Sequence, residues 1–263
     1  MPTGTPDFNA NLATNPTSPS YDSGEDTTRL LMGGGANSRA GRWLWATGFE
    51  NDPLGYGPIN LGTTFNGNGR NTIISLTKSP LGTDNISNQT IWQGNQCLEI
   101  RSGTLINQSI EVFKLIAWQS GVCGIEFFFC LLEDDLEQYE LQLFMTRDGY
   151  LGKANFGSIV LKRSATETKL YTDNNGTRVE ISDVAGHFDD GAMWHYIKMV
   201  YDMANNKYIR VYLDNLLFDL GSAPGYQITS GGFGDRFAVR FKTLAAAERI
   251  IRIDNLILTG DEP

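Results

Sequence analysis

Residues 194–215 read WHYIKMVYDMANNKYIRVYLDN, and this stretch decides the fold. Two runs rich in β-branched and aromatic residues, 194–201 and 208–213, flank a polar tip that contains Asn205 and Asn206. Such residues favour a half-buried pleated strand, and asparagine tolerates the left-handed backbone of a tight reversal. The stretch therefore predicts a long antiparallel β-hairpin.

The second run of this hairpin alternates in character from one residue to the next, which is typical of a strand with one buried face. The aliphatic residues are predicted to face the core and the others to face away from it: Ile209, Val211 and Leu213 against Tyr208, Arg210 and Tyr212. The same period of two predicts strands over 139–145 and 236–242, and in the latter Arg236, Arg240 and Lys242 should point outward. Residues 124–132 place apolar side chains on both faces of a predicted strand, which indicates that the strand is covered on both sides.

Three pieces of the chain resemble one fold family. The hairpin resembles the central hairpin of concanavalin A-like (laminin-G-like) jelly rolls, residues 45–50 (WATGFE) resemble their opening strand, and residues 252–260 (RIDNLILTG) their closing strand. The resemblance covers roughly residues 42–260. It implies an all-β, concanavalin A-like jelly-roll β-sandwich of two antiparallel sheets whose opening and closing strands pair. The family includes lectins, glycanases, lyases, adhesion modules and viral structural proteins, so the fold does not name a function.

Composition and charge exclude several classes of partner. The chain has 263 residues, of which 41% are hydrophobic, and a net charge of −9. That charge argues against nucleic acid, which is bound through Lys and Arg, and against an anionic membrane. No run of about 18 apolar residues exists, so we expect no transmembrane helix. No basic region followed by an apolar core opens the sequence, so we expect no signal peptide and synthesis in a host cytoplasm.

The three cysteines are expected to be reduced and mostly buried. Cys123 and Cys130 bound one predicted strand, which would separate them by roughly 20 Å, too far for a disulfide bond. Cys97 has no partner at C-x-x-C spacing.

Residues 1–40 differ in composition from residues 41–263, which we expect to form the jelly-roll domain. Pro, Thr, Asn, Ser and Gly dominate this segment, and its few large apolar residues are the candidate partner-binding anchors: Phe8, Leu12, Tyr21, Leu30, Leu31 and Met32. The segment buries too little apolar surface to offset an ordering cost of about 1–2 kcal/mol per residue. We therefore expect an extended N-terminal arm that neighbouring subunits hold in place. The alternative is that it folds back onto its own domain.

No catalytic arrangement stands out. Glycanases of this fold place their carboxylates as E-x-D-x-x-E, and that pattern is missing. Glu133, Asp134 and Asp135 are adjacent, so a strand would send them to opposite faces, and a solvated acidic turn is the better interpretation. The two histidines, His187 and His195, are interpreted as structural, and no G-x-S-x-G motif exists. We expect no enzyme activity and no cofactor.

Two further site hypotheses are weighed against simpler interpretations. Members of the family often hold a structural Ca²⁺ between the first and last strands, where Glu50 and Asp254 match; the simpler interpretation is a polar pair at a strand end, and we expect no bound metal. Trp43 and Trp45 share one face of a predicted strand and are either a sugar-stacking platform or, more often, part of the core or of an interface.

The polar stretches 51–69 and 78–89 are predicted to be loops, and residues 244–248 a single helical turn.

Three functional hypotheses follow. The first is a virion structural protein, a capsid decoration (cement) or tail protein, whose arm binds neighbouring subunits while the jelly roll faces outward at the virion surface. Its partners would be capsid or tail proteins of the same virion, with self-association and surface glycans as further partners. The second is a carbohydrate-binding, lectin-like module. The third, a glycan hydrolase or lyase, would require catalytic residues that the sequence motifs do not reveal.

Overall fold

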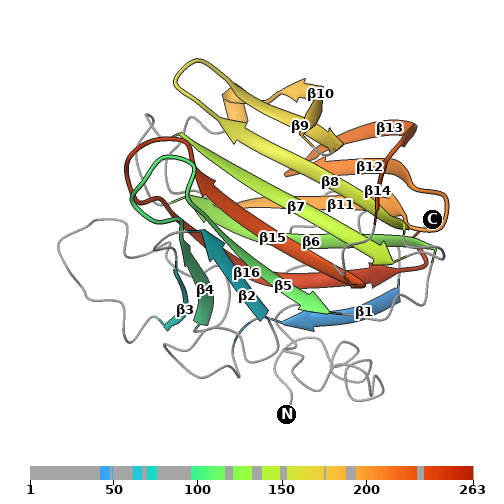
Figure 1. Ribbon diagram of the computed structural model, residues 1–263, viewed down its shortest axis with the longest axis horizontal. Coiled ribbons are helices and arrows are strands. Elements are labelled where there is room, and N and C mark those ends of the chain that lie inside the picture. Colours follow the sequence, from blue (N-terminus) through green and yellow to red (C-terminus); the bar gives the residue numbers. More distant parts are fainter. Residues whose placement is uncertain are drawn as a thin grey trace, which may run out of the picture.

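The computed structural model describes residues 42–47, 49, 62–66, 70–75, 96–115, 121–131, 138–148, 153–174, 176–187, 194–229 and 234–262. Within these residues the chain is nearly all β-strand and forms two eight-stranded antiparallel sheets that pack face to face (Figure 1). The prediction of an all-β jelly-roll sandwich is confirmed. The N-terminal arm, residues 1–40, lies outside the described residues, as do its six proposed anchors.

The first sheet, sheet A, contains the strands β1 (Arg42–Thr47), β3 (Arg70–Ser75), β4 (Gln96–Arg101), β6 (Val122–Leu131), β11 (Trp194–Asp202), β12 (Lys207–Leu213), β13 (Leu216–Pro224) and β16 (Ile250–Gly260). Their order is β13-β12-β11-β6-β16-β4-β3, and β1 also pairs with β16. The opening strand β1 and the closing strand β16 are therefore neighbours, as the resemblance implied.

The second sheet, sheet B, contains the strands β2 (Gly62–Asn66), β5 (Ser109–Leu115), β7 (Tyr139–Asp148), β8 (Lys153–Arg163), β9 (Thr168–Asn174), β10 (Thr177–Asp183), β14 (Tyr226–Thr229) and β15 (Arg236–Thr243). Their order is β10-β9-β8-β7-β15-β5-β2, and β14 also pairs with β8. Figure 1 shows β5, β15, β7 and β8 side by side across the front of the molecule.

The inward faces of the two sheets form one hydrophobic core. Sheet B contributes the alternate residues predicted from the sequence, among them Leu141, Leu143 and Met145, and sheet A contributes both Phe127 and Phe129. Because the inward residues of β7 and β15 are all apolar, the polar residues between them lie on the opposite, outer face of sheet B. That outer face carries the site described below.

The β11–β12 hairpin is confirmed, with one correction. Asn206 at its tip has a φ of 57°, the left-handed conformation that was expected. Tyr208 was predicted to face away from the core and Ile209 toward it, and this is wrong. The pairing register shifts at Tyr208, and a strand irregularity exchanges the two faces, so Tyr208 is fully buried in the main core and Ile209 packs on the outer side.

Two further predictions, a loop and a helical turn, also need correction. The predicted loop 51–69 contains the strand β2, and β5, β13 and β14 were not predicted. Residues 244–247 are bends, and no helical turn forms over 244–248. The Thr243 hydroxyl lies 2.8 Å from the carbonyl oxygen of Ala245 and 3.0 Å from that of Ala247, and it thereby competes with helical hydrogen bonding. The short 3-10 helix of the described chain lies instead at Ala185–His187.

All three cysteines are free and buried, as predicted. Burial raises the pKa of the Cys97 thiol well above its ordinary value and that of Cys130 to about 12. Across the part of the chain that the structure describes, no helix is long and apolar enough to span a bilayer.

Candidate functional site

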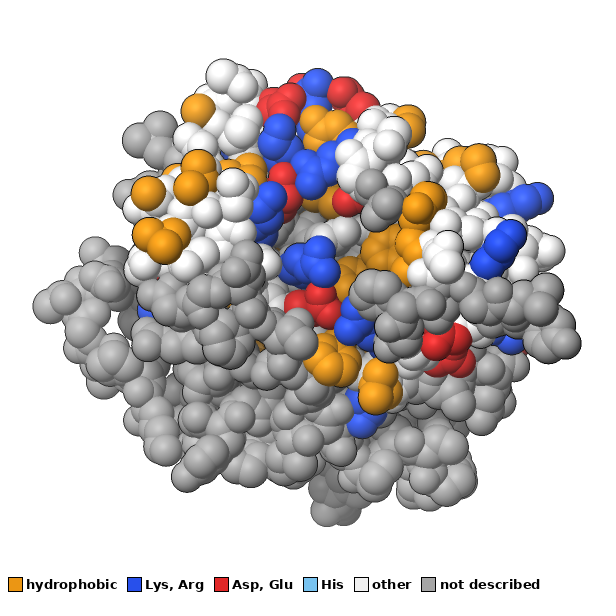
Figure 2. Space-filling view, in the orientation of Figure 1, with side chains coloured by type: hydrophobic (Ala, Val, Ile, Leu, Met, Phe, Trp, Pro, Cys, Tyr) orange, Lys and Arg blue, Asp and Glu red, His pale blue; other side chains and the backbone are white. Residues whose placement is uncertain are grey.

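A hollow of about 500 Å³ lies on the outer face of sheet B. Figure 2 shows the same face: blue Lys and Arg side chains gather around the hollow at its centre. The volume falls in the range of small-ligand sites, about 300–1,000 Å³. Its lining residues come from β5, β7, β8, β9, β10, β14, β15 and the β9–β10 turn: Ser109, Glu140, Gln142, Phe144, Phe156, Asp173, Gly176, Arg178, Ile228, Arg236, Arg240 and Lys242.

Strand register aligns the polar side chains of this hollow in rows. β15 lies between β7 and β5, so each of its outward residues has a partner on both sides. Arg240 is paired with Gln142 on β7 and with Glu111 on β5, and Lys242 is paired with Glu140 on β7. Directly opposed residues on one face are within contact distance, and opposite charges there stabilise the sheet.

Glu111 joins the two arginines of β15. Its carboxylate accepts hydrogen bonds from Arg240 Nη2 at 2.6 Å and Nε at 3.2 Å, and it forms an ion pair with Arg236 Nη1 at 3.1 Å. The Glu111 side chain is only 7% exposed, whereas the Arg240 side chain is 40% exposed. The carboxylate therefore lies beneath the guanidinium group that a ligand would meet.

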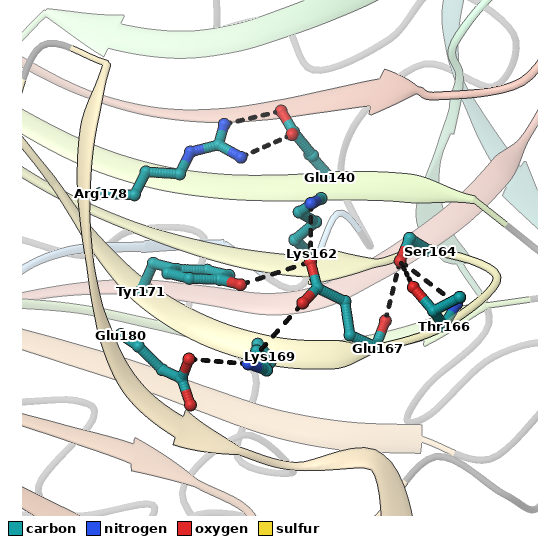
Figure 3. Close-up of polar contacts among 9 residues, drawn as sticks. All are labelled: Glu140, Lys162, Ser164, Thr166, Glu167, Lys169, Tyr171, Arg178 and Glu180. Carbon is teal, nitrogen blue, oxygen red and sulfur yellow. Dashed lines mark hydrogen bonds and ion pairs between the residues drawn. The ribbon is translucent and has the colours of Figure 1, made fainter.

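Glu140 is the central carboxylate of a second cluster, as Glu111 is of the first. Arg178 on β10 spans the two intervening strands and donates to both oxygens of Glu140, at 2.7 and 3.0 Å (Figure 3). Lys242 donates to the same carboxylate at 3.3 Å. Burial would raise the pKa of Glu140, but the hydrogen bonds and charges of Arg178 and Lys242 hold it below its ordinary value. Glu140 is therefore an ionised anchor.

Aromatic rings form part of the floor of the hollow. Phe144 stacks on Phe156 with 5.4 Å between the ring centroids. Ala238 on β15 is paired with Phe113 on one side and with Phe144 on the other. The Arg236 guanidinium lies 5.3 Å from the Phe113 centroid and 5.4 Å from that of Phe144, a cation–π arrangement that fixes its position.

Further polar groups complete the hollow beside these clusters. Gln142 Nε2 donates to Ser158 Oγ at 2.8 Å and to Asp173 Oδ2 at 3.4 Å. The other oxygen of Asp173 accepts the Gly176 backbone N–H at 2.6 Å, and Gly176 has a φ of 89°. The Asp173 carboxylate thus links the β9–β10 turn to the centre of the sheet.

A second polar chain lies on the same face over β8, β9 and β10 (Figure 3). Lys162 and Lys169 both contact Glu167, and Lys169 also contacts Glu180 at 2.8 Å. Because solvent screens ion pairs at the protein surface, these pairs contribute little to stability. They extend the polar surface beyond the hollow.

The sequence-based site hypotheses lie elsewhere. Glu50 is outside the described residues, and Asp254 is fully buried, with one oxygen accepting the Asn255 N–H at 2.8 Å. No group of three or more His, Cys, Asp or Glu in the described ranges is arranged to hold a metal ion. Trp43 and Trp45 lie in β1, but their side chains are not among those described.

The two histidines lie in separate parts of the described chain. His195 Nδ1 lies 2.9 Å from the Asp214 carboxylate on sheet A, away from the hollow, and His187 is in the 3-10 helix. The acidic turn 133–137 is outside the described residues.

The hollow itself was not predicted as a site. One signal was available, because Arg236, Arg240 and Lys242 were expected on one outward face. Their carboxylate partners lie far away in sequence, 129 residues for Arg240 and Glu111 and 102 residues for Lys242 and Glu140, and the sequence alone did not pair them.

Comparisons with known proteins establish the fold and not a family. No protein-family model matches the sequence, and no curated protein matches it in sequence. The carbohydrate esterase of the Shiga toxin-encoding bacteriophage phi24B matches with a TM-score of 0.51 and 14% identity over 76% of this chain and 91% of its own. The cellulose-induced protein Cip1 matches with a TM-score of 0.51 and 10% identity over 81% of this chain and 96% of its own. The chain is thus similar in fold to these two proteins.

Proposed function

We propose that this β-sandwich is a carbohydrate-binding domain and that the hollow on sheet B is its ligand site. The observation that carries the proposal is the construction of the hollow: hydrogen-bonding side chains from several strands converge on a space of about 500 Å³. Gln142 and Asp173 are held in place by neighbouring side chains and by backbone. Planar polar groups fixed on rigid strands suit the recognition of sugar hydroxyl groups.

The same geometry favours binding over glycan cleavage. A glycosidase needs one carboxyl group that stays protonated until it donates to the leaving group, so its pKa is raised. Glu140 is held by two cations, and its pKa is lowered. Glu111 is likewise engaged by Arg236 and Arg240. We therefore propose that the domain binds its ligand without chemical change.

A glycan array probed with the full chain tests this function. We expect a defined set of saccharides to bind, and Gln142→Ala to weaken that binding while leaving the thermal unfolding temperature nearly unchanged. Lys207→Ala is the matched control, because Lys207 is exposed on β12 of sheet A and does not line the hollow. An array without any bound saccharide, or binding that Gln142→Ala leaves intact, would refute the proposal.

A second role concerns the arm, and the sequence favours it independently. Residues 1–40 combine a polar, Gly- and Pro-rich composition with isolated apolar anchors such as Phe8, Leu12 and Tyr21. We propose that this arm binds neighbouring capsid or tail subunits, so that the hollow of sheet B is exposed at the virion surface. The fold likeness to a bacteriophage protein agrees with this role, although at 14% identity it supports the fold alone.

Deleting residues 1–40 separates the two roles. We expect the shortened chain to keep its fold and its saccharide binding but to be lost from purified particles, as measured by immunoblot. Replacement of the anchors Leu30, Leu31 and Met32 by serine should act in the same direction. Full incorporation of both variants would remove the proposed role of the arm and leave the carbohydrate-binding function in place.

A further inference from the structure

The charge around the hollow differs in sign from that of the whole protein. Four cations border the hollow in the described part of the chain: Arg178, Arg236, Arg240 and Lys242. Three carboxylates lie in contact with this set or line the same space: Glu111, Glu140 and Asp173. The hollow is therefore net positive in a chain whose net charge is −9. Figure 2 shows blue side chains as the prevailing charged groups around it.

The charges are also arranged by depth. Glu111, Glu140 and Asp173 are buried, whereas the Arg240 side chain is 40% exposed and those of Arg178 and Lys242 are 28% exposed. A ligand that enters the hollow thus meets guanidinium and ammonium groups first. The carboxylates beneath them hold the cations in place without covering them.

Arg240 keeps donors available for a ligand. A guanidinium group has five N–H donors, and Arg240 directs three of them to Glu111 and Gln142. Two N–H groups, one on each terminal nitrogen, are left on the exposed side chain. The planar arginine fork matches the paired oxygens of a carboxylate or sulfate group.

Phe144, at the centre of the hollow, does not offer the usual aromatic platform for a neutral sugar. Phe144 is only 1% exposed, because the Arg236 and Arg240 guanidinium groups lie over its ring. Recognition by ring stacking requires an open aromatic face, whereas here the cations occupy that face. Over Phe144 the accessible chemistry is therefore the charge-assisted hydrogen bonding of the guanidinium groups.

From these observations we infer that the ligand of the sheet B hollow is an acidic saccharide, one that carries a carboxylate or sulfate group bound by Arg240 with Lys242 and Arg178 nearby. The inference rests on the proposed carbohydrate-binding function and names its class of ligand.

Two matched pairs of polymers test it with the full chain in affinity electrophoresis and calorimetry. Polygalacturonate is compared with its methyl-esterified form, and dextran sulfate with dextran, and polyglutamate serves as an acidic polymer that is not a saccharide. We expect at least one acidic saccharide to bind more tightly than its neutral partner, and polyglutamate to bind weakly. Arg240→Gln should weaken that binding by about 10- to 100-fold, the range of a charge-assisted contact, and Arg240→Lys by less.

Lys207→Gln removes one positive charge from β12 of sheet A, outside the lining of the hollow, and should leave the affinity for the saccharide unchanged. Thermal unfolding of each variant checks that it is folded. Binding of neutral saccharides alone overturns the acidic-ligand inference and leaves the carbohydrate-binding function standing. Equal binding of polyglutamate, or an acidic saccharide that binds Arg240→Gln undiminished, also overturns it. Failure of every saccharide, here and on the glycan array, overturns the proposed function itself.

Discussion

The Tyr208 hydroxyl on sheet A makes two hydrogen bonds to the backbone of Ser158 on sheet B. It accepts one from the Ser158 N–H at 2.9 Å and donates one to the Ser158 carbonyl oxygen at 2.9 Å. At this point β8 changes partner, because β14 pairs with residues 153–156 and β9 begins to pair at Ile159. The backbone between these pairings lacks a strand neighbour on that edge. The Tyr208 hydroxyl supplies its hydrogen bonds and so links the two sheets.

Tyr208→Phe should therefore destabilise the protein. The change leaves the buried Ser158 N–H and carbonyl without this partner, and we expect the free energy of unfolding in urea to fall by about 1–3 kcal/mol. Tyr212→Phe on the same strand is the control, since the buried Tyr212 hydroxyl has no hydrogen-bond partner in the described structure. That variant should be neutral or slightly more stable. Equal losses in the two variants would contradict the linking role of Tyr208.

Tyr201 occupies the space beside this junction and makes a glycine necessary. A Cβ atom on Gly157 would lie 2.5 Å from Cδ2 of the fully buried Tyr201 ring. Gly157→Ala should cost about 1–3 kcal/mol of unfolding free energy, because the packed ring cannot move away. Gly186→Ala should be harmless, since a Cβ atom there meets nothing within 4 Å. A Gly157→Ala variant as stable as Gly186→Ala would show that the ring has room to shift.

The sequence predicted the strands whose alternation is simple and failed where the register breaks. Leu141, Leu143 and Met145 face the core as expected, because nothing interrupts β7. The prediction failed at Tyr208 and Ile209, where one strand irregularity reverses the two faces, whereas Val211 and Leu213 after it face the core as expected. A period of two carries no warning of such a break, since its cause is the pairing with another strand.

For a related reason, the sequence predicted the cations of the candidate site but not their carboxylate partners. The outward direction of Arg236, Arg240 and Lys242 followed from the apolar residues between them. Their partners Glu111 and Glu140 come from strands that become neighbours only through the topology of the sheet. A local pattern therefore predicts which face a charge is on but not which charge lies beside it.

The outer side of sheet A contains a buried ion cluster that should be sensitive to a single substitution. The fully buried Lys198 ammonium lies 2.7 Å from Glu262 and 3.0 Å from Glu126. Lys198→Met leaves two buried carboxylates facing each other, and we expect about 3–5 kcal/mol to be lost from the unfolding free energy measured in urea. Lys207→Met, at an exposed position, should change it by less than about 0.5 kcal/mol. A small loss for Lys198→Met would mean that the cluster rearranges around methionine.

The lowered pKa of Glu140 makes the stability of the fold depend on pH, and this dependence can be assigned to the contact with Arg178. A carboxyl group whose pKa is lower in the folded state stabilises the fold at pH values above its ordinary pKa, and this contribution is lost as the pH falls through the folded-state pKa. Glu140→Gln should therefore be less stable than the wild type at pH 7, and the two stability curves should converge below the ordinary pKa of 4.5. Combining it with Arg178→Met should shrink the difference at pH 7, because Arg178 is the main cause of the lowered pKa. A gap between the curves that stays constant down to pH 3 would place the effect of Glu140 in packing and not in its charge.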